Sequence, residues 1–123
     1  MAKGKLPHYI TMKSGAPLAA AGIWSSWRDR DTEQRVLTCA ILTGTPNQLL
    51  EPIHDRMPCI LPEDAWTPWL DRSNDDVDAL RSLLTVYPAS EMSETPVSTL
   101  VNNVRNDAPE LIAPLKTPVV DRP

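Results

Sequence analysis

The stretch LAAAGIWSSWRDRDTEQRVLTCAILT, residues 18–43, decides the fold of this chain. Residues 18–27 place small and apolar side chains in both phases of strand alternation, which is typical of a strand buried on both faces. Residues 36–43 repeat this pattern with β-branched side chains, and the charged run 28–35 between them predicts a solvated hairpin loop. Gly22 indicates a bulge or a close backbone approach. We therefore expect an antiparallel hairpin that needs cover on both of its faces.

Further strands flank this hairpin on both sides in the sequence. Residues 6–13 are apolar enough for a short strand, and the turn signal SGAP at 14–17 ends it. Short loops favour pairing between neighbouring strands, so the first three strands predict an antiparallel meander. The runs CIL at 59–61 and TPVSTLVN at 95–102 indicate two more strands.

Short helices are expected between and after these strands. Thr45 is a candidate N-cap for a helix of one or two turns, because Pro46 suits the first helical position and Pro52 limits the length. Three further helical segments are expected, at 62–71, 74–87 and 108–115. Residues 116–123 are expected to form a flexible tail. The fold class is therefore α+β, with a mixed, largely antiparallel, barrel-like sheet and short helices.

Composition narrows the classes of function. The chain has 123 residues, a formal net charge of −4 and 41% hydrophobic residues, which fits one globular domain rather than a strongly basic nucleic-acid binder. No apolar run approaches the roughly 18 residues of a membrane span, and we expect no secretory signal. Cys39 and Cys59 lie in apolar runs, which favours buried, reduced thiols in a cytoplasmic protein. Zinc-ligand spacing, a glycine-rich phosphate loop and a nucleophile elbow are all missing, so neither a metal nor another cofactor is expected.

His54 is the most distinctive candidate functional residue. It follows a short helix and precedes a strand within EPIHDRMPCILP, residues 51–62, and working residues often lie at such junctions. Asp55 can fix the imidazole tautomer or accept from Arg56. From spacing alone, a structural histidine remains an alternative. Another alternative pairs His54 as base with Cys59 as the nucleophile of a hydrolase, although a nucleophile needs an exposed, activated thiolate.

Five sequence blocks occur in the order and with the gaps of a known family. They are AAAGIWSSW (19–27), CAILTGTPN (39–47), IHDRMPCIL (53–61), AWTPWLD (65–71) and VSTLVNNVRNDAPELI (97–112). Together they resemble the SRAP family, the SOS-response-associated peptidases, which are also described as abasic-site processing proteins. The resemblance covers about residues 5–115, and IHDRMP is its most specific piece. It implies that residues 1–115 form the C-terminal portion of a SRAP domain.

The resemblance implies a module of the DNA damage (SOS) response that becomes covalently linked to DNA. Family members bind single-stranded DNA at abasic sites, and their N-terminal cysteine forms a thiazolidine with the ring-opened sugar aldehyde. His54 matches the histidine that supports this reaction, which suits an imidazole because ring opening moves a proton near neutral pH. Arg56 and Thr43 match residues that face the DNA phosphates. The family is also associated with peptidase self-processing and with a lyase-like reaction.

The sequence departs from the family at its start. SRAP proteins begin Met-Cys-Gly-Arg, whereas this sequence begins Met-Ala-Lys-Gly, and the family's catalytic asparagine and glutamate have no counterpart. Residues 1–123 are therefore expected to be inactive alone and to need the N-terminal half of the domain as a partner. The alternative is a catalytically dead remnant with weak DNA binding or a structural role. We expect Met1 to be an internal methionine, preceded in frame by Glu-Trp and, roughly 100 codons upstream, by a Met-Cys-Gly-Arg start.

Overall fold

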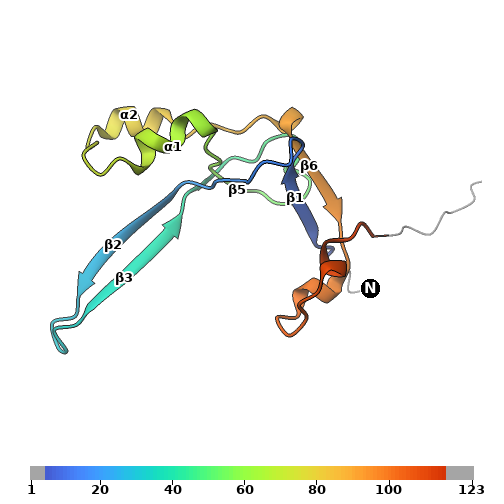
Figure 1. Cartoon of the computed structure of the whole chain (residues 1–123), viewed down its shortest axis with the longest axis horizontal. Coiled ribbons are helices and arrows are strands. Elements are labelled where there is room, and N and C mark those ends of the chain that lie inside the picture. Colours follow the sequence, from blue (N-terminus) through green and yellow to red (C-terminus); the bar gives the residue numbers. More distant parts are fainter. Residues whose placement is uncertain (1–4, 116–123) are drawn as a thin grey trace, which may run out of the picture.

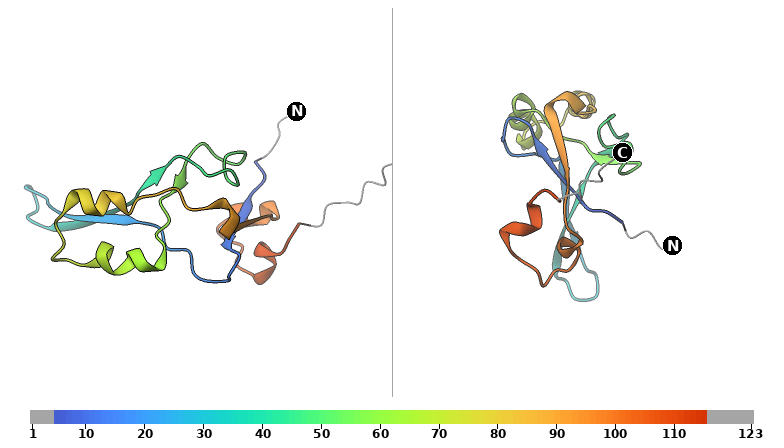
Figure 2. Two further views of the ribbon diagram at one scale, coloured as in Figure 1. Left: turned by 90° about the horizontal axis from the view of Figure 1, so that it is seen from above. Right: turned by 90° about the vertical axis from the view of Figure 1, so that its right-hand side faces the viewer.

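The fold is an arch built from short strands and helices. A computed structural model describes residues 5–115 of the chain. In chain order, the elements are β1 (His8–Met12), β2 (Gly22–Arg28), β3 (Arg35–Ile41), β4 (Thr43–Gly44), β5 (Met57–Pro58), α1 (Glu63–Leu70), α2 (Val77–Ser82), the 3-10 helix η1 (Ala89–Glu91), β6 (Met92–Pro96), and the 3-10 helices η2 (Thr99–Asn102) and η3 (Pro109–Ile112). One limb of the arch is the long β2–β3 hairpin, and the other holds β1, β6 and the C-terminal turns (Figures 1 and 2). Helices α1 and α2 lie over the top (Figure 1).

The α+β class expected from the sequence is confirmed, and every strand pairing is antiparallel. The described strands form three two-stranded sheets, namely β1–β6, β2–β3 and β4–β5. Because each sheet stops at two strands, no barrel closes within residues 5–115. No helix in this part of the chain is long and apolar enough to cross a membrane.

The first strand pairs with the last one, so the predicted meander is wrong at this point. β1 runs antiparallel to β6, with Met12 opposite Met92. Across the same pair, His8 Nδ1 lies 2.6 Å from Glu94 Oε2. The turn after β1, where Gly15 has a φ of 80°, and the extended chain that follows carry β2 away from β1 (Figure 1). Strands that are neighbours in the sequence are therefore not neighbours in a sheet here.

Local caps shift two of the predicted boundaries. The strand expected at 95–102 is instead β6 followed by η2. The Ser98 hydroxyl accepts from the Leu100 N–H at 3.2 Å, and this contact starts a helical turn where the strand was expected to continue. The helix expected at 74–87 is the shorter α2, and its N-cap is Asp76. Side-chain capping thus decides where these elements begin.

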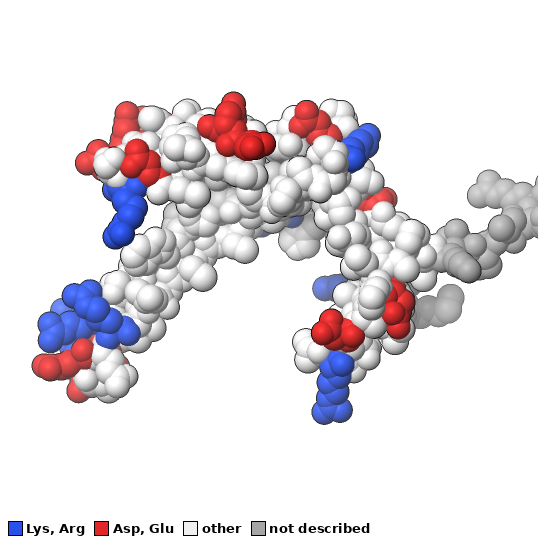
Figure 3. Space-filling model, viewed as in Figure 1, with Lys and Arg blue, Asp and Glu red and all other residues white. Residues whose placement is uncertain are grey.

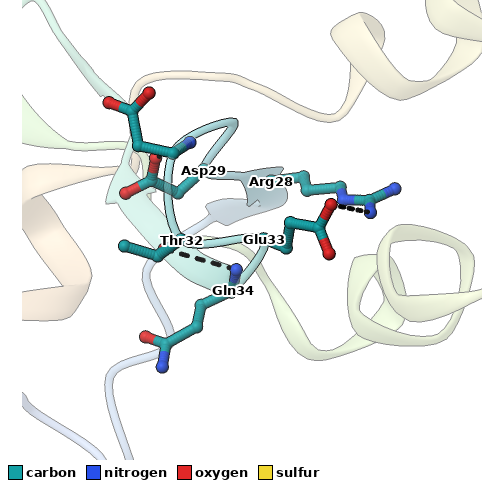
Figure 4. Close-up of polar contacts among 6 residues, drawn as sticks. Arg28, Asp29, Thr32, Glu33 and Gln34 are labelled. Atoms are coloured by element: carbon teal, nitrogen blue, oxygen red, sulfur yellow. Dashed lines mark hydrogen bonds and ion pairs between the residues drawn. The ribbon is translucent and has the colours of Figure 1, made fainter.

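The hairpin predicted around residues 28–35 is confirmed. The ladder between β2 and β3 is unbroken at Gly22, so no bulge forms there. At the tip, the Arg28 guanidinium lies 3.8 Å from the Glu33 carboxylate, and both side chains are largely exposed (Figure 4). The loop is therefore solvated, as its charged sequence predicts.

The faces of this hairpin are exposed, whereas its apolar sequence predicts burial. Every residue of β2 and β3 is exposed. Cys39 is therefore exposed rather than buried, and Cys59 is half-buried. The physical reason is that no layer of residues within 5–115 covers either face of the hairpin.

Two small clusters of buried side chains form the core. The first joins β1, β5 and β6 and consists of Met12, Leu50, Met57, Ile60 and Met92. The second lies against α1 and consists of Ala21, Leu61 and Ala65. Helix α1 confirms the helix expected at 62–71, and Trp66 and Trp69 pack on this second cluster as its apolar stripe predicts.

Candidate functional site

The candidate site is built on the small β4–β5 sheet and on the loop that joins its strands. Thr43 lies opposite Pro58 in this antiparallel pair, so residues 45–56 form a closed loop, which we call the His54 loop. Arg56 and Pro58 are exposed and flank the buried Met57, which is the alternation expected of an extended segment. Thr43, which lies opposite Pro58, is exposed too.

Asn47 organises the first turn of the His54 loop. Its Oδ1 accepts from the N–H groups of Leu49 and Leu50, both at 3.1 Å. The Leu50 carbonyl then accepts from the His54 N–H at 2.9 Å, which continues the turn to the histidine. The sequence predicts a short helix capped at Thr45, but residues 48–53 form turns and no helix. Asn47 starts these turns, because its side-chain oxygen accepts from the free backbone donors.

The same asparagine ties the loop to the core. Asn47 is only 7% exposed, and its Nδ2 donates to the Tyr87 carbonyl at 2.8 Å and to Met92 Sδ at 3.3 Å. Its backbone N–H donates to Met57 Sδ at 3.1 Å. A hydrogen bond with Glu91, followed by burial, raises the pKa of the Tyr87 phenol. Because a buried amide without partners is costly, these contacts favour one position of the loop.

The two ring nitrogens of His54 lie in different environments. The side chain is 68% exposed, and Nδ1 accepts from the Arg56 N–H at 3.0 Å. Nδ1 also lies 3.1 Å from the Asp55 carboxylate. One nitrogen cannot accept and donate at once, so the first contact needs a bare Nδ1 and the second needs an Nδ1–H. Nε2 has no hydrogen-bond partner within residues 5–115, which leaves it available to exchange a proton with a bound molecule.

The β4–β5 sheet and the His54 loop carry an exposed cation, an exposed hydroxyl and an exposed imidazole. The Arg56 guanidinium makes no ion pair within the described part of the chain. A guanidinium binds two phosphate oxygens at once with its fork of donors, and a threonine hydroxyl such as that of Thr43 adds another donor. This arrangement on an open surface suits the phosphate backbone of a nucleic acid.

Of the three residues that the sequence resemblance singles out, His54 and Arg56 are joined by a hydrogen bond, and Thr43 lies in β4 opposite Pro58, two residues after Arg56. Cys59 lies beyond β5, and no hydrogen bond joins it to His54 in the region from residue 5 to residue 115. Among the described residues, no contact supports the Cys59–His54 pair of a cysteine hydrolase. No group of three or more His, Cys, Asp or Glu side chains that could hold a metal ion occurs among the described residues.

Comparison with known proteins finds one family that matches most of the chain. The sequence model of the SOS response associated peptidase (SRAP) family matches residues 1–104. Abasic site processing protein YoqW from Bacillus subtilis is 44% identical over 110 residues, which are 89% of this chain and 49% of that protein. Abasic site processing protein HMCES from Gallus gallus is 36% identical over 100 residues, which are 80% of this chain and 29% of that protein.

A solved structure shares the fold. The crystal structure of a protein from Bacteroides thetaiotaomicron matches with a TM-score of 0.80 at 28% sequence identity. The match covers 94% of this chain and 51% of that one. The chain thus spans about half the length of the YoqW and Bacteroides proteins, at 49% and 51%.

Replacing the buried amide tests how the loop is held. Asn47→Asp is expected to lower the free energy of unfolding by about 1–3 kcal/mol at pH 7, because a carboxylate cannot donate to the Tyr87 carbonyl. Burial raises the pKa of the introduced carboxyl, so this loss should shrink as the pH falls toward about 4, where the protonated group donates again. Urea denaturation of the variant and the unmodified chain at both pH values measures the difference.

Asn103→Asp is the matched control for this substitution. Asn103 is exposed and uses its Oδ1 to accept from the Arg105 N–H at 3.0 Å, which a carboxylate does equally well. Its effect is expected to stay within about 0.5 kcal/mol at both pH values. Equal losses for the two variants, or a loss for Asn47→Asp that does not change with pH, would contradict the role of the buried donor.

Proposed function

Because this chain belongs to the SOS response associated peptidase (SRAP) family, we propose that it forms part of a domain that binds single-stranded DNA and becomes covalently linked to it at abasic sites. Relatives that match most of the chain are named abasic site processing proteins, which supports DNA with abasic sites as the partner. The observation that carries the proposal is the exposed, hydrogen-bonded pair of His54 and Arg56 in the His54 loop, next to the sheet that holds Thr43.

Arg56 and Thr43 are proposed to hold the DNA backbone. Contacts with phosphates position a strand without reading its bases, which suits a protein that must act at abasic sites in any sequence. The Arg56 side chain is exposed, and no carboxylate within the described residues pairs with it. A net charge of −4 for the chain is compatible with this role, because such contacts need only a few basic groups in one place.

His54 is proposed to move a proton during opening of the abasic sugar. The ring-closed sugar is a hemiacetal, and its opening removes the proton of the C1′ hydroxyl and delivers one to the ring oxygen, which yields an aldehyde. An imidazole performs both transfers near neutral pH, and Nε2 of His54 has no competing partner among the described residues. At Nδ1, the Arg56 N–H can donate to the bare nitrogen, and Asp55 can accept from an Nδ1–H.

The covalent bond itself needs a cysteine with a free α-amine. The amine and thiol of such a residue condense with the aldehyde, release one water and form a thiazolidine. Neither Cys39 nor Cys59 has a free α-amine, so we propose that this cysteine comes from the part of the SRAP domain outside residues 1–123. A remnant that binds DNA without chemistry is the second candidate, because residues 1–123 carry the phosphate-facing group but no such cysteine.

Arg56→Ala is expected to weaken binding to single-stranded oligonucleotides by a similar factor for every base composition. Since a phosphate contact releases about one counterion, the dependence of log affinity on log salt should become shallower by roughly one unit. Fluorescence anisotropy over a range of salt concentrations measures both effects. Arg105→Ala removes another exposed arginine and should leave affinity and slope unchanged. A loss confined to one base context would argue against a phosphate contact.

His54→Ala is expected to slow covalent trapping of an abasic oligonucleotide, by about 10²-fold or more, with little change in its affinity. The assay uses the domain completed with the half of the SRAP fold that residues 1–123 do not span, and denaturing electrophoresis follows the product. Residues 1–123 alone are the negative control and should give no heat-stable product. A large loss of affinity with an unchanged trapping rate would place His54 among the binding residues instead.

A further inference from the structure

Both faces of the β2–β3 hairpin are apolar and exposed. Residues directly opposite each other in an antiparallel pair share a face, so the strand register assigns each side chain to one of the two faces. On one face, three large side chains are more than 60% exposed: Trp24, Leu37 and Ile41. On the other face, three are more than 40% exposed: Ile23, Trp27 and Val36. The hairpin thus lacks cover on both sides within the described residues.

Helix α1 extends this apolar surface at the base of the hairpin. The Trp69 Nε1–H donates to the Gly22 carbonyl at 3.1 Å, which holds the helix against the start of β2. Beside this contact lies a cavity of about 390 Å³ whose lining includes Trp66, Trp69 and Leu70. In Figure 3 the charged side chains gather at the tip of the hairpin and over the helices, and the flank of the hairpin between them carries none. The surface therefore suits an apolar partner.

The shape of this surface restricts what can cover it. A two-stranded hairpin is marginally stable on its own, and each of its outer edges presents unpaired backbone groups. Exposed apolar patches of this extent on a soluble protein mark interaction sites. A partner on one side would leave the other face exposed, so the cover must reach both faces. An enclosing fold meets this requirement, whereas a single flat surface does not.

We propose that the β2–β3 hairpin and the adjoining surface of α1 bind the half of the SRAP fold that this chain does not span. The Bacteroides structure matches 94% of this chain with a TM-score of 0.80, yet only 51% of its own length is used in the match. The remaining part of such a protein is therefore about as long as this chain. A polypeptide of that length is large enough to pack against both faces of a hairpin with seven residues in each strand. The proposal rests on family membership and not on the chemistry at His54.

A second copy of the chain fits this surface less well. A two-fold interface uses the same patch on both copies, so it covers one face of each hairpin and leaves the opposite face exposed. The two tryptophans lie on opposite faces, because Trp24 and Trp27 are three residues apart along β2. A complementary half that surrounds the hairpin removes both from water.

Joint refolding with the missing half tests the proposal. Residues 1–123 are refolded together with the half of YoqW that they do not match, and separately with the corresponding half of YoaM, a Bacillus subtilis relative that is 41% identical over 110 residues. Size-exclusion chromatography with light scattering over a dilution series gives stoichiometry and affinity. A one-to-one complex is expected, with a shift of tryptophan fluorescence to shorter wavelength as Trp24 and Trp27 leave water.

Substitutions on the two faces show where the partner binds. Leu37→Ser and Trp27→Ser alter opposite faces, and each is expected to weaken the complex by at least about tenfold. Val104→Ser is the matched control, since Val104 is 97% exposed and follows η2, on the other limb of the arch. All three positions are exposed in the free chain, so their circular dichroism and unfolding should match the unmodified chain.

Several results would overturn the proposal. No complex with either half would do so, as would a homodimer that depends on Leu37 and Trp27, or a complex that only one of the two hairpin substitutions weakens. The proposed function is tested separately from the role of the hairpin. A hairpin-dependent complex that contains the N-terminal cysteine but never traps abasic DNA would contradict the chemistry and leave this inference intact.

Discussion

The buried side chain of Asn47 is the interaction on which the candidate site depends. One amide caps the turn through its oxygen and reaches the Tyr87 carbonyl and Met92 through its nitrogen. It therefore connects the loop between β4 and β5 to the segment that leads into β6. Without it, the loop would have few contacts to fix it, because His54 and Asp55 are largely exposed. A polar group in the core thus gives an exposed site a defined position, which pure apolar packing provides less specifically.

A second constraint acts on the chain as a whole. The described residues contain two small buried clusters and a hairpin whose strands are exposed along their full length. The candidate site rests on the first cluster, through Leu50, Met57 and Met92, and does not touch the hairpin tip. The part of the fold that positions His54 is therefore separate from the part that lacks cover. The proposed phosphate contacts at Arg56 and the proposed enclosure of the hairpin can accordingly be tested independently.

Local patterns predicted the local structure well. The hairpin around residues 28–35, the helix at 62–71 and the α+β class follow from alternation, charge and helical spacing within short windows. The pairing of β1 with β6 joins segments about 80 residues apart. A pattern within a short window of sequence cannot predict such a contact. Burial of the hairpin was also predicted wrongly, since its sequence reflects a need for cover that residues 5–115 do not meet.

The candidate site was likewise predicted only in part. Thr43, His54 and Arg56 were identified through a family motif, because spacing alone did not separate a working histidine from a structural one. Asn47 was missed even though asparagine is among the best N-caps, since Pro46 made Thr45 the more obvious cap. Its bonds to Tyr87 and Met92 cross 40 and 45 residues of sequence, so its role emerges only when the fold is known.

The most direct test of DNA binding at the His54 loop is a titration of residues 1–123 with a single-stranded oligonucleotide that carries an abasic site. Amide chemical shifts are followed during the titration. The largest changes are expected at Thr43, His54 and Arg56, and an undamaged oligonucleotide should reproduce those at Thr43 and Arg56. Changes confined to the arginine-bearing hairpin tip at residues 28–35, with none in the His54 loop, would contradict DNA binding at this loop.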